Sequence, residues 1–158
     1  MIGRTIDQLA VGDAAELTRE VTPGDILKFV ESVGDRNPVH SDLAYAASTL
    51  FREPIAPGIW TAGLISAVIG TELPGPGSIY VTQELRFLRP VKPGDTITTR
   101  VEVVEILRER NRVRLKTTCR NQRGEVVLDG EAWVLPSKVP VSYPTSTAGT
   151  PSQGTSPA

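Results

Sequence analysis

In the second half of the chain, apolar and polar residues alternate over several segments, which is typical of β-strands with one buried face. The alternation is cleanest where Val113 and Leu115 are interleaved with Arg114 and Lys116. Pro, Gly, Asn and Asp residues separate the segments, as expected of turns. The pattern predicts about four strands that pair in chain order as an antiparallel meander. The predicted strands cover residues 78–89, 96–107, 113–120 and 125–135.

Residues 58–71 are apolar on nearly every side of a helix, which indicates a buried helix rather than an amphipathic surface helix. Large side chains such as Trp60 and Leu64 are interspersed with small ones such as Gly63 and Ser66. The small residues let neighbouring backbone approach closely. We therefore expect this segment to be the central helix of the fold.

A shorter helix is predicted between Thr22 and Gly34. Thr22 suits the N-cap, and Pro23 suits the first helical position. Gly34 suits the left-handed residue that ends a helix. We also predict a strand over residues 15–21 and a short helix over residues 42–50.

Hairpin-connected strands with segregated helices predict an α+β fold, in which a curved antiparallel sheet wraps a long central helix. A chain of 158 residues suits one domain, which we place at residues 1–136. Residues 137–158 are rich in Pro, Ser, Thr and Gly and have no apolar pattern after Tyr143. This composition predicts a disordered tail.

Charge and composition exclude several classes of protein. The 17 Lys and Arg residues nearly balance the 18 Asp and Glu residues, which gives no reason to expect a nucleic acid or an anionic membrane as partner. The longest apolar run, residues 59–70, is shorter than the roughly 17–25 residues of a membrane-spanning helix. The first residues lack the apolar run of a secretory signal, so we expect a cytoplasmic protein. One His and one Cys exclude the usual zinc ligand sets, and Cys119 is expected to be a core residue.

The candidate chemistry lies in residues 34–40, which contain Asp35, Asn37 and the chain's only histidine, His40. Pro38 restricts its own φ and that of the preceding residue, so the segment should be a rigid turn. A carboxylate and an imidazole that converge on one water form a general acid–base arrangement. The alternative is a loop that ends a helix and whose Asp and Asn bond their own backbone.

The same segment resembles the motif of the MaoC-type (R)-specific enoyl-CoA hydratases, the hydratase 2 group of the hot dog fold. That motif has an aromatic residue, then Gly-Asp-x-Asn-Pro, an aliphatic residue and His, with a small residue six positions later. The resemblance covers roughly residues 8–136. Its matching positions are Phe29, residues 34–40, Ala46, residues 73–80 and residues 87–95.

The resemblance implies a hot dog fold with residues 58–71 as the wrapped helix, and a homodimer in which acyl-CoA enters near the subunit interface. It assigns Asp35 and His40 to the hydration chemistry and the backbone N–H of Gly58 to the thioester oxygen. It also places Ser66 beside the catalytic pair. The unpaired N–H groups and positive dipole of a helix N-terminus independently suit a developing oxyanion at Gly58.

The implied reaction is the syn addition of water to trans-2-enoyl-CoA, giving (R)-3-hydroxyacyl-CoA without a metal or redox cofactor. Asp35 would accept a proton from the water, and His40 would either orient that water or return a proton to C2. Alternatives are a 3-hydroxyacyl-thioester dehydratase acting on CoA or acyl carrier protein, a hot dog thioesterase, and a non-catalytic acyl-binding subunit. Pro57 departs from the family, which commonly has His there.

Three residues are further candidates for the substrate pocket, each with a structural alternative. Asn37 is also a turn-forming residue. Trp60 either packs under the sheet or narrows the acyl pocket and so favours short acyl chains. Ser66 either hydrogen-bonds in the pocket or packs the helix against a neighbour.

Deletion of residues 145–158 is expected to leave both hydratase activity and the melting temperature unchanged, because the segment has no core-forming pattern. Thermal denaturation and crotonyl-CoA hydration of the full and shortened chains test this expectation. A large fall in either quantity would show that the segment docks on the domain.

Overall fold

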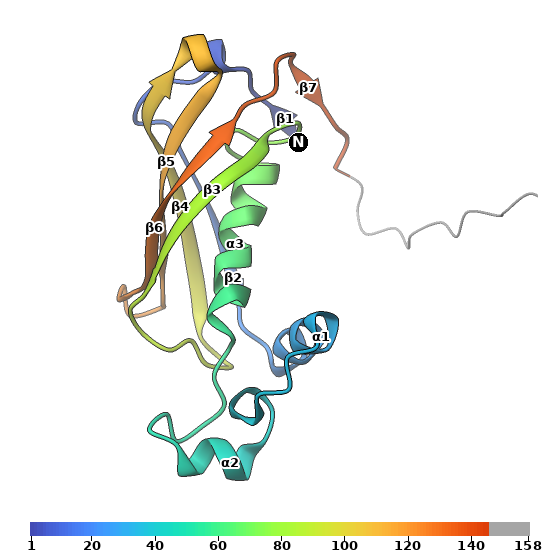
Figure 1. Ribbon diagram of the computed structural model, residues 1–158, viewed down its shortest axis with the longest axis vertical. Coiled ribbons are helices and arrows are strands. Elements are labelled where there is room, and N and C mark those ends of the chain that lie inside the picture. Colours follow the sequence, from blue (N-terminus) through green and yellow to red (C-terminus); the bar gives the residue numbers. More distant parts are fainter. Residues whose placement is uncertain (146–158) are drawn as a thin grey trace, which may run out of the picture.

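The computed structural model describes residues 1–145 of the 158-residue chain (Figure 1). Five strands form one antiparallel sheet in the order β2-β4-β5-β6-β3. The strands are β2 (Ala14–Glu20), β3 (Ile79–Phe87), β4 (Thr96–Leu107), β5 (Arg112–Arg120) and β6 (Val126–Leu135). The α+β fold and the positions of these strands along the sequence agree with the prediction.

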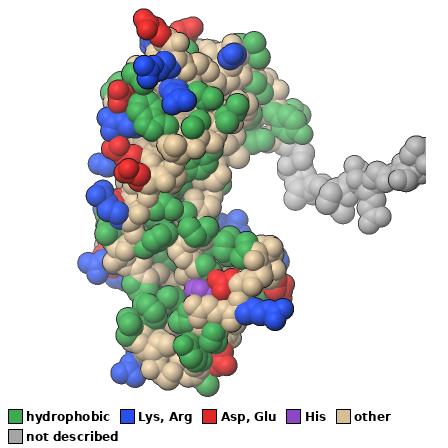
Figure 2. All heavy atoms as spheres, in the orientation of Figure 1, with side chains coloured by type: hydrophobic (Ala, Val, Ile, Leu, Met, Phe, Trp, Pro, Cys, Tyr) green, Lys and Arg blue, Asp and Glu red, His purple; other side chains and the backbone are tan. Residues whose placement is uncertain are grey.

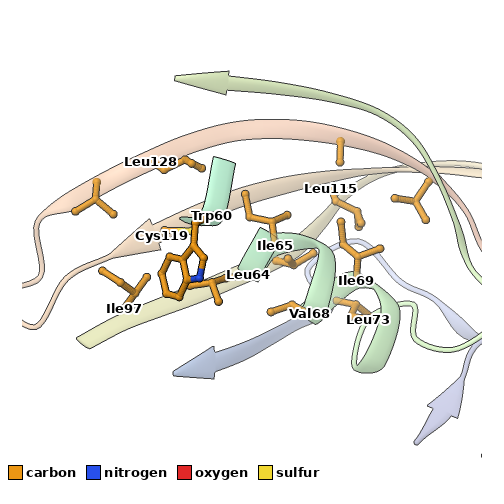
Figure 3. Close-up of a cluster of buried hydrophobic side chains, with 14 of the residues drawn as sticks. Trp60, Leu64, Ile65, Val68, Ile69, Leu73, Ile97, Leu115, Cys119 and Leu128 are labelled. Carbon is orange, nitrogen blue, oxygen red and sulfur yellow. The ribbon is translucent and has the colours of Figure 1, made fainter. Parts of the chain in front are cut away.

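Helix α3 (Gly58–Thr71) has the bounds that its apolar composition predicts, and it lies along one face of the curved sheet. Its side chains Ile65 and Val68 are fully buried. In Figure 3 the helix packs against side chains from several strands, including Ile97, Leu115 and Leu128. Each large apolar side chain buried in this way contributes about 1.5–3 kcal/mol to folding. This packing fixes where α3 begins relative to the end of the sheet.

The strand order differs from the predicted meander. Strands β4, β5 and β6 do pair in chain order, but β3 pairs with β6 at one edge, and β2 occupies the other edge beside β4. Residues 88–95 separate β3 from β4, and this connection exceeds the 2–5 residues of a usual hairpin loop. The longer connection lets β3 and β4 lie apart in the sheet.

The prediction of a disordered tail from residue 137 is wrong for residues 137–145. Strand β7 (Val141–Ser142) pairs with β1 (Ile2–Gly3), and Ser137 forms a bridge with Thr5. Composition missed this pairing because it is made by backbone groups of two short segments, far apart in sequence. Residues 146–158, the rest of the predicted tail, lie outside the described residues.

The helices between residues 23 and 48 form a lobe beyond the end of the sheet, next to the start of α3 (Figure 1). Helix α1 (Pro23–Val33) begins and ends as predicted, because the Thr22 hydroxyl accepts from Asp25 N and Gly34 adopts a left-handed φ of 73°. A short 3-10 helix, η2 (Pro38–His40), leads to α2 (Leu43–Ser48). The other 3-10 helices are η1 (Ile6–Gln8) and η3 (Arg108–Arg110). Among the helices of residues 1–145, none is long and apolar enough to cross a membrane.

Gly130 is expected to be indispensable to the pairing of β6 with β3. A Cβ atom at this position would lie 1.8 Å from the Glu84 carbonyl oxygen. Gly130→Ala should therefore lower the free energy of unfolding by at least about 1–3 kcal/mol, the usual cost of overpacking. Thermal denaturation measures the loss. The matched control is Gly24→Ala, whose added methyl group would meet only the Thr22 hydroxyl at 3.8 Å. Equal melting temperatures for the two variants would contradict this strand packing.

Candidate active site

The turn after α1 is held by its own side chains, as the sequence suggests. Asp35 N donates to Val30 O (2.9 Å), and Asp35 Oδ1 accepts from Asn37 N (2.9 Å). The Asn37 carboxamide accepts in turn from Val39 N (3.3 Å). Asn37 thus caps η2, which agrees with its interpretation as a turn-forming residue. The second carboxylate oxygen of Asp35 remains for other contacts.

His40 is fixed in position and in tautomer by one hydrogen bond. Its Nδ1 atom lies 2.7 Å from the carbonyl oxygen of Ile55. Because a carbonyl oxygen only accepts, Nδ1 carries the proton in the neutral ring, and Nε2 holds a free lone pair. The His40 side chain is 9% exposed and the Asp35 side chain 31%. The His40 imidazole is therefore sheltered, whereas the Asp35 carboxylate is more open.

The Asp35 carboxylate and the His40 imidazole face one another across a gap. His40 Nε2 lies 3.6 Å from Asp35 Oδ2, which is too long for a direct hydrogen bond. One water that lies beside the line joining these two atoms can still hydrogen-bond both of them. The pair thus converges in space as the motif predicts, and the geometry suits two groups that act on one water.

The pair opens into a pocket of about 410 Å³, which we call the catalytic pocket. Its walls include Phe29, Val33, Asp35, His40, Gly58 and Ile59. Figure 2 shows the histidine in the hollow between the lobe and the body of the molecule. An apolar pocket with a few convergent polar groups is the usual form of a small-molecule site.

Gly58 begins α3 at the edge of this pocket. The first N–H groups of a helix have no acceptor within the helix, and Pro57, the N-cap residue, supplies no side-chain cap. A Cβ atom on Gly58 would lie 2.6 Å from a ring carbon of Phe87, so the ring leaves no space for a side chain there. The first backbone donors of α3 therefore have no side-chain cap at the edge of the pocket. Pro57 stands one position before the first helical residue.

The structure brings Asp35, His40 and Gly58 together, but Asn37, Trp60 and Ser66 do not line the catalytic pocket. Trp60 is buried in the core beside Leu64 and Cys119 (Figure 3), which favours the core interpretation of this residue. Ser66 lies on the exposed face of α3.

Cys119 is the core residue that the sequence predicts. It is fully buried, and its Sγ lies 3.4 Å from Thr99 Oγ1. Burial raises the pKa of the Cys119 thiol to about 11, so the thiol is protonated near neutral pH and is a poor nucleophile. Within residues 1–145, no group of three or more His, Cys, Asp or Glu side chains is placed to hold a metal ion.

A second hollow, which sequence reasoning missed, lies against the other side of Gly58. This apolar pocket also measures about 410 Å³ and shares Gly58 and Ile59 with the catalytic pocket. Its walls include Phe51, Thr61, Phe87, Leu88, Val127 and Leu128. The sequence contains one sign of this pocket, the aromatic residue Phe87 at the end of β3, which is exposed in the structure. The sequence does not show, however, that the fold brings Phe87 to the start of α3.

Comparisons with known proteins agree on one family. The sequence model of the MaoC like domain matches residues 10–124. A 3-hydroxybutyryl-CoA dehydratase of Methylorubrum extorquens is 50% identical over 134 residues, which are 85% of this chain and 83% of that protein. An (R)-specific enoyl-CoA hydratase of Rhodospirillum rubrum is 43% identical over 129 residues, 82% of this chain and 89% of that protein. The structure of the unliganded R-hydratase PhaJ1 from Pseudomonas aeruginosa superimposes with a TM-score of 0.88 at 45% identity, covering 97% of this chain and 98% of that one.

The Trp60→Leu variant tests whether the indole packs in the core or lines the acyl pocket. Because the indole packs in the core, the variant should lose at least about 1 kcal/mol of unfolding free energy. It should keep the wild-type ratio of kcat/KM for short and long enoyl-CoA substrates. Trp133→Leu, which changes a half-buried tryptophan on β6, is the control and should lose less stability. A shift toward long chains with an unchanged melting temperature would instead place Trp60 at the acyl pocket.

Proposed function

Because this chain belongs to the MaoC-like dehydratase family and has its hot dog fold, we propose that it adds water to trans-2-enoyl-CoA to give (R)-3-hydroxyacyl-CoA. The main support from the site is the 3.6 Å gap between Asp35 and His40, opposite the start of α3. The reaction is that of a hydro-lyase, and the groups that move protons are side chains of the chain itself.

The first requirement is a polarised thioester. C3 of the enoyl group is electrophilic only while the thioester oxygen draws electrons from the conjugated system. In our proposal that oxygen accepts from the Gly58 N–H, where the helix dipole also favours negative charge. One such donor is worth about 2.7–4 kcal/mol in comparable acyl-transfer sites.

The second requirement is an activated water. We place it within hydrogen-bond distance of both Asp35 Oδ2 and His40 Nε2, and the lone pair of Nε2 accepts one of its hydrogens. Asp35 accepts the other hydrogen as a proton while the water oxygen bonds to C3. The enolate then takes that proton at C2 and regenerates the carboxylate. In this scheme His40 orients the water, and both new bonds form on one face of the alkene.

A homodimer is part of the proposal. Strand β3 is an edge strand whose Ile79 and Val81 are exposed, and unpaired strand edges readily pair with a second chain. The exposed face of α3 carries Gly63 and Ser66, small residues that permit close approach. A partner on this side would cover Ser66 and the mouth of the site. The cytoplasmic location remains a prediction from the sequence.

The reverse reaction, dehydration of a 3-hydroxyacyl thioester, is the second candidate. The relative at 50% identity is named for it, as a 3-hydroxybutyryl-CoA dehydratase. Microscopic reversibility gives the same residues the same roles, so the site itself does not choose the direction. For this dehydration the acyl group is carried as a thioester of CoA or of acyl carrier protein.

Hydration of crotonyl-CoA tests the proposal. The wild-type protein should decrease the absorbance of the enoyl group without releasing free CoA. The product should have the R configuration at C3. Asp35→Asn and His40→Gln should each remain folded and lose at least about 10²-fold in rate, the usual acid–base contribution. Asp129→Asn, which changes a carboxylate paired with Arg86 outside the pocket, is the matched control and should keep full rate.

Free thiol in place of hydrated product would indicate a thioesterase, and binding without turnover would indicate an acyl-binding subunit. Near-normal turnover in either site variant would remove that residue from the mechanism.

A further inference from the structure

One buried hydroxyl group is left without a hydrogen bond. Within residues 1–145, Thr61 Oγ1 is the buried side-chain oxygen or nitrogen that has no partner, and Thr61 is only 2% exposed. Thr71, at the other end of the same helix, behaves as threonines in helices often do, because its hydroxyl donates to Ala67 O at 2.7 Å. An unpaired buried hydroxyl is destabilising. Thr61 therefore suggests a partner that comes from outside the chain.

Thr61 stands in the wall of the apolar pocket, one helical turn after Gly58. The other walls of this pocket are mostly apolar side chains. A single hydroxyl in such a pocket fixes the orientation of a bound ligand and provides specificity, whereas the apolar walls provide most of the affinity.

The apolar pocket lies between the catalytic pocket and the charged surface. It meets the catalytic pocket at Gly58 and Ile59. At its other side it shares Arg89 and Pro90 with an open groove. The walls of that groove include Lys92 and Arg123, which are paired with Glu53 and Glu125. The three hollows therefore follow one another from the Asp35–His40 pair to the outside.

The proposed function fixes the direction in which a bound thioester would lie along these three hollows. With its oxygen at Gly58 and C3 beside Asp35 and His40, the acyl group occupies the catalytic pocket. The sulfur then points into the apolar pocket. The arm that carries the thioester is a flexible chain of methylene groups interrupted by amides, and in CoA it ends in phosphates. An apolar channel that opens onto a groove of charged side chains matches that order, with methylene groups first and polar groups last.

We propose that the Thr61 hydroxyl hydrogen-bonds the amide of the carrier arm nearest the thioester sulfur; this inference rests on the proposed function. Three residues of helix rise about 4.5 Å, which separates Gly58 from Thr61 along the axis. The amide nitrogen is four bonds from the thioester carbonyl carbon, roughly 5 Å in an extended chain. A hydroxyl both donates and accepts, so it can serve the N–H or the C=O of that amide.

The test compares three crotonyl thioesters: crotonyl-CoA, S-crotonyl-N-acetylcysteamine, which retains the first amide, and S-propyl thiocrotonate, which has none. Thr61→Val should lower kcat/KM about tenfold for the two amide-bearing substrates and leave the propyl thioester unchanged. Thr61→Ser should restore the loss. The melting temperature of Thr61→Val should stay level or rise by about 2–4 °C, because an unpaired buried hydroxyl has been removed. Thr71→Val is the control, and it should lose stability without any dependence on the carrier.

Unchanged kcat/KM in Thr61→Val for all three substrates would overturn the inference and leave the hydratase proposal standing. An equal loss for all three would overturn it as well, since the hydroxyl would then act on the acyl or thioester part. Failure of the wild type to hydrate any of the thioesters would refute the proposed function and this inference with it.

Discussion

The packing of α3 against the sheet is the interaction on which the rest of the structure depends. Fully buried side chains such as Ile65 and Val68 fix the helix on the sheet, and so fix the position of its first residue. That residue, Gly58, has the Phe87 ring against its Cα atom and borders both pockets. A helix N-terminus held in this way offers backbone donors that need no reorganisation when charge develops in front of them.

Several polar contacts join the lobe to this frame, and one of them is made by the His40 imidazole. The bond between His40 Nδ1 and Ile55 O joins the turn after α1 to the segment that leads into α3. The same bond selects the tautomer and turns Nε2 toward Asp35. Position and tautomer of the imidazole are therefore set together, as is common where a backbone carbonyl holds the second ring nitrogen.

Local patterns were sufficient to predict much of this arrangement. The caps at Thr22 and Gly34 and the apolar composition of α3 are encoded within single segments, and so is the turn that carries Asp35 and His40. The place of β3 at the sheet edge and the pairing of β1 with β7 depend on contacts between distant segments. The apolar pocket was missed for the same reason, because Thr61 and Phe87 line one pocket only once the sheet packs against the helix.

The central claim is that one water, held between Asp35 and His40, is added to one face of an enoyl thioester whose oxygen lies at Gly58. The most direct test is hydration of crotonyl-CoA in D₂O, followed by NMR of the product at C2 and C3. The account predicts a single diastereomer in which deuterium and hydroxyl have added to the same face, with R configuration at C3. Addition to opposite faces, or a mixture of diastereomers at C2, would contradict it.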